Sequence, residues 1–193
     1  MAELTRRLGE AKNAFQQLSA VWNHANVTRQ RKIRILETCI FSKLLYGLES
    51  CVLLAADRER LDGFQARCLR RIYKILPAFI SRVSNAEVRS TAGARPLSAA
   101  LLQKQLDFYG KLARAHPNTL PRRMVFEEGR VHCILPRDWH SSRKRGRPRL
   151  QWAAYMHACA LSLAGDDPER LQNLLKSPVA QWEAAVRRYC RSL

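Results

Sequence analysis

The sequence predicts an all-α protein: a bundle of amphipathic helices, a basic proline-containing loop and a small C-terminal helical segment. Apolar residues recur at helical spacing over the first two thirds of the 193-residue chain. The hydrophobic fraction of 47% is enough to build a core and argues against wholesale disorder. No internal repeat is evident, so we expect a single helical domain with an appended segment.

Two helices are expected before residue 50. The apolar stripe of the first has alternating steps of four and three residues and consists of Leu4, Leu8, Ala11, Phe15, Leu18 and Trp22. Thr28 is placed to cap the second helix, and Gly47 to interrupt or end it. The second apolar stripe is made of Ile33, Leu36, Ile40 and Leu44.

A third helix is predicted to begin near Asp57 and to end before Pro77. Its apolar face would be Leu61, Phe64, Cys68, Ile72 and Ile75, which leaves Arg60, Arg67, Arg70, Arg71 and Lys74 on the remaining surface. Almost no acidic residue follows Asp62, so pairing with carboxylates one turn away cannot neutralise this face. Two interpretations stay open, a solvated helix face and a phosphate-facing surface.

A short helix followed by a longer one is expected next. Ser84 and Glu87 have the spacing of a capping box, and Gly93 would close the short helix. The longer helix runs from about Ser98 to Ala115. In outline the pair is similar to a helix-turn-helix motif, although a plain helical hairpin has the same outline.

Residues 116–150 differ from the rest, with four prolines and nine Lys/Arg against three Asp/Glu. We expect a basic loop there, with a short strand around Val131 to Leu135. Helix is predicted to resume near Leu150, with Asp167 and Pro168 starting a further helix before the last one. The predicted organisation is therefore a helical domain over 1–115, a basic linker over 116–149 and a helical segment over 150–193.

The formal charge is +18, from 34 Lys/Arg against 16 Asp/Glu. Nucleic acid is the usual partner for such a charge, and an anionic membrane surface is the competing one. Lys43 and Glu49 interrupt the most apolar stretch, so no membrane span is expected. The N-terminus has no apolar run typical of a secretory signal, and the six cysteines lack paired spacing. We expect an intracellular, nuclear protein with reduced thiols.

No cofactor, metal or catalytic residue is expected from the sequence. The scattered ligands His132, Cys133 and His140 lack the regular spacing of a zinc module. The adjacent pair Asp166 and Asp167 has the context of a helix cap and not of a Mg²⁺ site. No phosphate-binding glycine loop or nucleophile elbow is present in the sequence.

The stretch "SSRKRGRPRLQW" has the core of an AT-hook, a short extended element that lies in the minor groove. Glycine and proline keep such a backbone slim, and arginines favour the narrow, negative groove of A·T tracts. A generic phosphate-binding loop is the alternative interpretation. The residues expected to contact nucleic acid here are Arg143, Lys144, Arg145, Arg147 and Arg149. Those expected in the helical part are Arg31, Lys32, Arg34, Arg67, Arg70, Arg71 and Lys74.

The order of several segments resembles the region downstream of the catalytic palm in reverse transcriptases of non-LTR (LINE-type) retrotransposons. The similar segments are "AKNAFQQLSAVW", "RKIRILETCIFSKLLYGLES", "RLDGFQARCLRRI", "RVSNAEV", "PLSAALLQKQLDFYGKLAR", "LPRR" and "RKRGRPRLQW", from about Gly9 to Trp152. The chain departs from the family at Cys51, where Trp is frequent, and at "DFYGKLAR", where an "RWxGH" pattern is frequent.

The resemblance implies that residues 29–76 belong to a polymerase thumb, which tracks the template–product duplex through its backbone. It also implies that RNA, DNA or an RNA–DNA hybrid is the partner, and that the "RKRGRPR" stretch engages template or target. The palm with its metal-binding aspartates lies outside this sequence, so we expect a non-catalytic fragment of an RNA-directed DNA polymerase. The alternatives are a DNA-architectural or regulatory protein that uses the AT-hook-like core, residual polymerase function in an assembly that supplies the palm, and a non-functional relic.

Overall fold

The computed structural model describes residues 2–24, 26–126 and 151–192, and this part of the chain is mostly helical, with no sheet. The all-α prediction is confirmed. None of the described helices combines the length and the apolar character that a membrane crossing requires. The predicted strand around Val131 to Leu135 lies outside the described residues.

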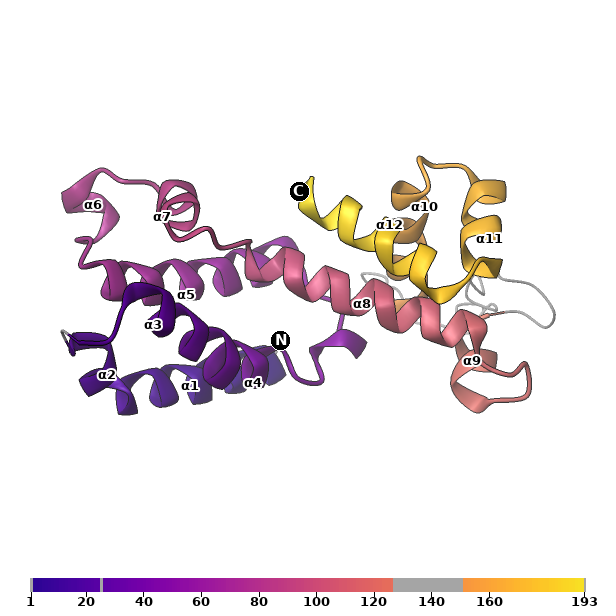
Figure 1. The fold of residues 1–193 in the computed structure, drawn as a ribbon. Coiled ribbons are helices and arrows are strands. Elements are labelled where there is room, and N and C mark those ends of the chain that lie inside the picture. The colour runs from indigo at the N-terminus through magenta and orange to yellow at the C-terminus, as the bar shows by residue number, and fades with distance from the viewer. Residues whose placement is uncertain (1, 25, 127–150, 193) are drawn as a thin grey trace, which may run out of the picture. The chain divides into compact units, whose positions relative to one another are not determined.

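The chain divides into two compact units (Figure 1). Unit 1 comprises residues 1–48 and 53–101, and unit 2 comprises residues 49–52 and 102–193. This division differs from the predicted boundary at residue 115. Helix α8 (Leu97–Arg114) contributes its first residues to unit 1 and the rest to unit 2. Because the apolar pattern runs through that helix without a break, the sequence gives no sign of the boundary between the two units.

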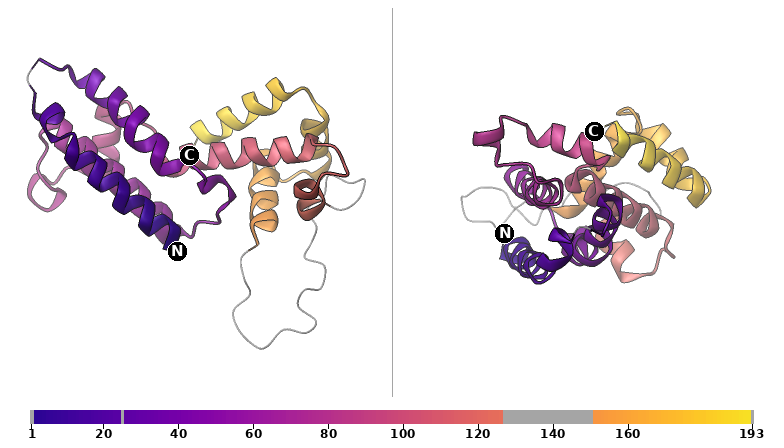
Figure 2. Two further views of the ribbon diagram at one scale, coloured as in Figure 1. Left: turned by 90° about the horizontal axis from the view of Figure 1, so that it is seen from below. Right: turned by 60° about the vertical axis from the view of Figure 1, so that its left-hand side comes forward.

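Unit 1 contains, besides the start of α8, helices α1 (Ala2–Gln17), α2 (Ser19–Asn23), α3 (Arg29–Ile35), α4 (Ser42–Leu45), α5 (Ala55–Tyr73), α6 (Ala78–Ser81) and α7 (Asn85–Ala92). A π-helical stretch, Leu36–Phe41, joins α3 to α4 without a break. Helix α1, this continuous segment and α5 run side by side (Figures 1 and 2). Their facing apolar side chains form the core of unit 1.

The predicted helix boundaries of unit 1 follow from capping chemistry. Thr28 accepts a hydrogen bond from the amide of Arg31, and Ser84 and Glu87 form the complete capping box. Gly47 and Gly93 have φ of +74° and +60°, a backbone conformation that glycine adopts at low cost. These predictions are confirmed.

The apolar stripe of α1 packs inward through Leu4 and Ala11, and Trp22 of α2 is 1% exposed. The Trp22 indole donates a hydrogen bond to the Phe15 carbonyl and stacks on the Phe15 ring. These two contacts fix the turn between α1 and α2, so the predicted first stripe continues across two helices.

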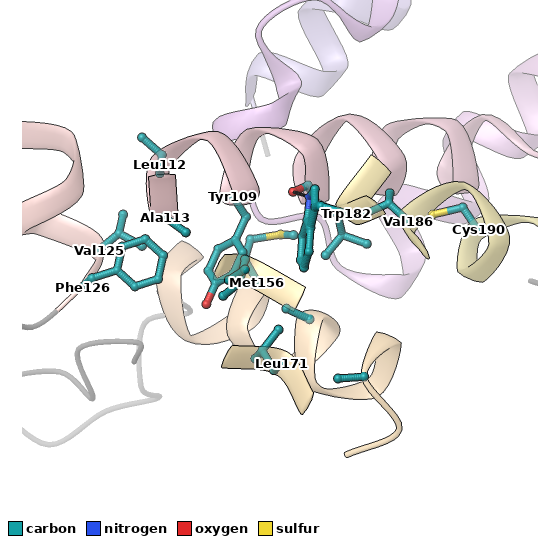
Figure 3. Packing of buried hydrophobic residues seen from close by; sticks show 14 residues of the cluster. Tyr109, Leu112, Ala113, Val125, Phe126, Met156, Leu171, Trp182, Val186 and Cys190 are labelled. Carbon is teal, nitrogen blue, oxygen red and sulfur yellow. Dashed lines mark hydrogen bonds between the residues drawn. The ribbon is translucent and has the colours of Figure 1, made fainter. Parts of the chain in front are cut away.

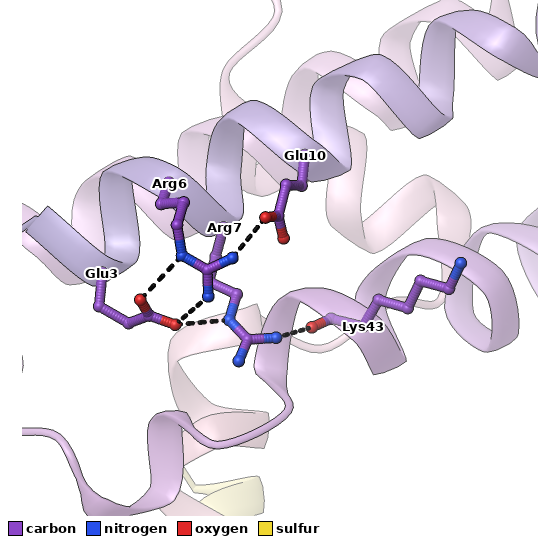
Figure 4. A network of polar contacts seen from close by, with 5 residues as sticks. All are labelled: Glu3, Arg6, Arg7, Glu10 and Lys43. Carbon is purple, nitrogen blue, oxygen red and sulfur yellow. Dashed lines mark hydrogen bonds and ion pairs between the residues drawn. The ribbon is translucent and has the colours of Figure 1, made fainter.

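Two arginines on the polar face of α1 pair with carboxylates of the same helix (Figure 4). Glu3 accepts hydrogen bonds from Arg6 and Arg7, which lower the pKa of its carboxyl to about 2, and Arg6 also pairs with Glu10. Arg7 reaches across to the Lys43 carbonyl of α4. The two arginines of α1 therefore form ion pairs with carboxylates of their own helix.

Unit 2 contains the rest of α8 together with α9 (Leu120–Val125), α10 (Trp152–Leu163), α11 (Pro168–Lys176) and α12 (Val179–Arg191). Helix α9 lies in the stretch predicted to be loop, and that part of the prediction is wrong. Pro121 stands in the first turn of α9, where the missing amide hydrogen costs no hydrogen bond. The predicted cap before α11 is confirmed, because Asp167 accepts from the amide of Glu169.

The core of unit 2 centres on aromatic residues (Figure 3). Tyr109 of α8 is fully buried and packs among the rings of Phe126, Trp152 and Trp182. The Trp182 indole of α12 donates to the Leu106 carbonyl of α8 at 3.2 Å. Its ring lies so close to α8 that a Cβ atom added to Gly110 would be 2.3 Å from the indole nitrogen. Glycine at 110 is thus what permits this approach.

We predict that Gly110→Ala destabilises the protein by about 1–3 kcal/mol, because the added methyl group overpacks the indole of Trp182. Urea denaturation followed by circular dichroism measures the change. Gly9→Ala is the matched control, since Gly9 lies inside α1 with no atom near its added Cβ. Higher helix propensity should make this control more stable by up to about 1 kcal/mol. A stabilised Gly110→Ala would contradict the packing described here.

Candidate nucleic-acid interface

One exposed stripe of α5 carries only positive charge. Arg67, Arg71 and Lys74, here called the basic stripe, are spaced by four and three residues and are all exposed. Arg67 and Arg71 are about 6 Å apart along the axis of α5, and Lys74 is the left-handed residue that ends this helix. The Arg67 guanidinium extends over Gly63, one turn earlier. Their side chains make no hydrogen bond or ion pair with any residue that the structure describes.

Two of the three carboxylates of α5 are used inside unit 1, and the third, Glu59, is exposed about two turns before Arg67. Asp57 is buried and pairs with Arg60. Asp62 accepts hydrogen bonds from the amide and the hydroxyl of Ser98, and thereby caps the first turn of α8. Gln65 assists by accepting from the amide of Leu97 at 3.2 Å. The carboxylates of Asp57 and Asp62 are therefore turned toward unit 1 and do not neutralise the stripe.

The sequence beyond Asp62 adds no compensating charge. Residues 63–86 contain five Lys/Arg and no Asp or Glu. In unit 1 as a whole, 17 Lys/Arg stand against 7 Asp/Glu. The second half of α5 therefore carries an uncompensated excess of cations, to which a polyanion would be attracted.

Arg70, predicted to face solvent with the stripe, is buried at 7% exposure, so its predicted place on the surface is wrong. Its guanidinium donates to the carbonyls of Leu76 and Val83 at 2.9 and 2.6 Å. It also reaches the side chains of Ser81 and Asn85 at 3.4 and 3.2 Å. All four acceptors follow α5 in the chain, so the helical pattern of α5 contains no sign of them.

Lys32 is also misplaced by the sequence prediction. It is 7% exposed, and its ammonium group donates to the His24 carbonyl at 2.8 Å. Lys32 stands four residues before the buried Leu36, and this spacing is the signal that places it on the inward face of α3. Arg31 and Arg34 are exposed on other sides of α3, as predicted.

Arg29 was not among the predicted contact residues, yet it is exposed at the start of α3 and its guanidinium lies over the Tyr73 ring of α5 at 5.3 Å. A cation over an aromatic face is favourable and helps to hold α3 against the end of α5. Arg143, Lys144, Arg145, Arg147 and Arg149 lie outside the described residues, so their predicted contacts stay predictions.

The described residues contain no catalytic constellation that we can assemble. No three His, Cys, Asp or Glu among them are placed to hold a metal ion. Burial raises the pKa of the Cys68 thiol to about 12, which makes this cysteine a poor nucleophile. The Tyr109 hydroxyl is hydrogen-bonded to the ring of His157 within the aromatic core of unit 2. The basic stripe is thus the best-defined candidate site.

Comparison of the chain with protein-family models, with curated proteins and with solved structures found no match.

We predict that Arg70→Met destabilises the protein by about 2–4 kcal/mol, because the carbonyls of Leu76 and Val83 lose their donor while the apolar stem is kept. Urea denaturation gives the value. Arg71→Met is the matched control: the adjacent arginine is exposed, so its loss should change stability by no more than about 0.5 kcal/mol. Equal effects of the two substitutions would contradict the structural role of Arg70.

Proposed function

We propose that this chain is a non-catalytic nucleic-acid-binding module that contacts the phosphate backbone through Arg67 and Arg71 of α5 and Lys74 at the C-terminal end of that helix. The observation that carries the proposal is the exposed basic stripe, whose side chains pair with no carboxylate among the described residues. Arg31 and Arg34 of α3 are further exposed cations for phosphate contact. Such contacts position a protein on nucleic acid largely without reading sequence.

The alternatives for an exposed basic stripe are pairing within the protein and simple solvation. Pairing is the fate of the α1 arginines, which are bound by Glu3 and Glu10. The stripe on α5 has no comparable partner among the described residues. Binding of a polyanion releases condensed counterions and relieves the repulsion among these cations, which favours a nucleic-acid partner.

The resemblance to the thumb of LINE-type reverse transcriptases agrees with this proposal, because a thumb tracks a duplex through backbone contacts. In that setting the partner is RNA, DNA or an RNA–DNA hybrid, and the protein acts in the nucleus. The chemistry of polymerisation would be supplied by a palm outside this sequence.

We predict that the variant Arg67→Gln/Arg71→Gln/Lys74→Gln binds duplex DNA more weakly and with a shallower dependence on salt. The slope of log affinity against log salt should fall by about 0.9 for each phosphate that the variant no longer binds. Fluorescence anisotropy of a GC-rich duplex, titrated at several salt concentrations, measures both effects. All three side chains are exposed, so the thermal unfolding temperature should be unchanged.

The matched control removes the same charge elsewhere. Lys176, Arg188 and Arg191 of unit 2 are exposed, and their replacement by glutamine should leave the slope close to that of the unchanged protein. If both triple variants reduce the slope equally, net charge and not the basic stripe accounts for binding. A slope near zero for the unchanged protein would reject the proposed function.

A second candidate function is DNA-architectural binding through the AT-hook-like core "RGRPR", favoured by its two arginines flanking Gly146 and preceding Pro148. If it operates, Arg145→Ala/Arg147→Ala will abolish a preference for AT-rich over GC-rich duplex and spare binding to the GC-rich one. Competition between the two duplexes in the same anisotropy assay tests this. Equal affinity of the unchanged protein for both duplexes would exclude this function.

A further inference from the structure

The segment between α5 and α7 presents large apolar side chains to solvent. Leu76, Phe79 and Ile80, here called the apolar tip, are 57%, 75% and 54% exposed. Phe79 is the most exposed large apolar side chain among the residues that the structure describes. A group of exposed apolar residues at one place indicates a binding surface more often than a single exposed residue does.

The apolar tip is held in a defined conformation. Arg70 donates to the carbonyl of Leu76, the first residue of the tip, and to that of Val83, which follows the tip. Ser81 closes the short helix α6 by donating to the Leu76 and Pro77 carbonyls. The side chains of the tip thus extend from a backbone that is fixed by a buried arginine, and little order is lost when they bind.

The chain turns sharply at each end of the tip. Lys74 and Arg82 both have φ of 58°, in the left-handed region, and both side chains are exposed. The apolar tip is therefore flanked by cations, with Arg71 one turn before Lys74. No acidic residue occurs between positions 63 and 86. The ligand of this surface should combine an apolar face with negative charge.

We propose that the apolar tip binds unpaired nucleotides, with Phe79 stacked on a base and Arg71, Lys74 and Arg82 near the adjoining phosphates. Unpaired nucleotides present flat apolar faces together with phosphates, and aromatic side chains among cations are the usual platform for them. The inference rests on the proposed function, because the tip continues the basic stripe of α5. It assigns the stripe to the backbone of a duplex and the tip to an adjoining single strand.

An anionic membrane offers the same two features, but the structure favours nucleotides. Helix α6 is four residues long, whereas membrane-surface helices have a long apolar face that is inserted along the bilayer. The tip supplies only three apolar side chains, and it adjoins the exposed cations Arg71, Lys74 and Arg82.

The test compares a blunt GC-rich duplex with the same duplex carrying an oligothymidine overhang, at one salt concentration, using the full chain. We expect tighter binding to the overhang substrate. Phe79→Ala should weaken that binding about tenfold, the usual effect of losing one stacked base, and leave blunt-duplex binding unchanged. Phe79→Trp should retain the advantage of the overhang, and Phe79→Leu, which is apolar without a stacking ring, should lose most of it.

Tyr46→Ala is the matched control, because Tyr46 is a 70% exposed aromatic residue of the same unit outside the tip. It should not change the advantage of the overhang. If Phe79→Ala binds both substrates as the unchanged protein does, the inference is overturned while the proposed function stands. If the overhang gives no tighter binding, and the protein instead sediments with phosphatidylserine vesicles in a way that requires Phe79, the inference is overturned in favour of a lipid surface. Absence of binding to blunt duplex would reject the proposed function itself.

Discussion

The hydrogen bonds of the buried Arg70 guanidinium shape the surface that we propose to bind nucleic acid. The guanidinium binds two backbone carbonyls and two side chains from residues 76–85. A buried charge is tolerated only when its donors are paired, so the segment after α5 has to fold back over this side chain. That fold-back sets the turn at Lys74 and presents Leu76, Phe79 and Ile80 to solvent. Stability and the candidate binding surface of unit 1 thus depend on the same contact.

The distribution of carboxylates explains why α5 has an uncompensated basic face. A helix usually neutralises its exposed cations with acids one turn away, as α1 does with Glu3 and Glu10. In α5 the carboxylate of Asp57 is buried, that of Asp62 is bonded to the start of α8, and the exposed Glu59 lies about two turns before Arg67, too far along the helix for pairing one turn away. Carboxylates that serve structure cannot also screen the surface. The repulsion left on the basic stripe is a cost to the folded protein that bound phosphates would offset.

Unit 2 is stabilised by a different kind of constraint, the contact between an aromatic ring and a helix backbone. The Trp182 indole bonds to the Leu106 carbonyl and covers Gly110, so α12 is held close to α8. The guanidinium of Arg114, also on α8, lies over the Trp182 ring, 5.7 Å from the ring centre. Close packing between these two helices therefore stabilises unit 2.

The sequence alone determined the helical class, most helix boundaries and the caps, because these depend on neighbours within one or two turns. Thr28, Ser84, Gly93 and Asp167 act where the pattern placed them. The exposure of Arg67, Arg71 and Lys74 was likewise readable from their spacing against the apolar face of α5.

Only the tertiary structure decided which cations are available. Arg70 and Arg71 are adjacent in sequence and identical in chemistry, yet one is buried and the other exposed, because the acceptors of Arg70 come from a segment that folds back after the helix ends. Lys32 is also withdrawn from the surface, by the His24 carbonyl, although its spacing from Leu36 already indicated the inward face of α3. The division inside α8 and the approach of Trp182 to Gly110 also depend on partners far away in the chain. Helical periodicity assigns a residue to a face, but packing between distant segments decides whether that face meets solvent or protein.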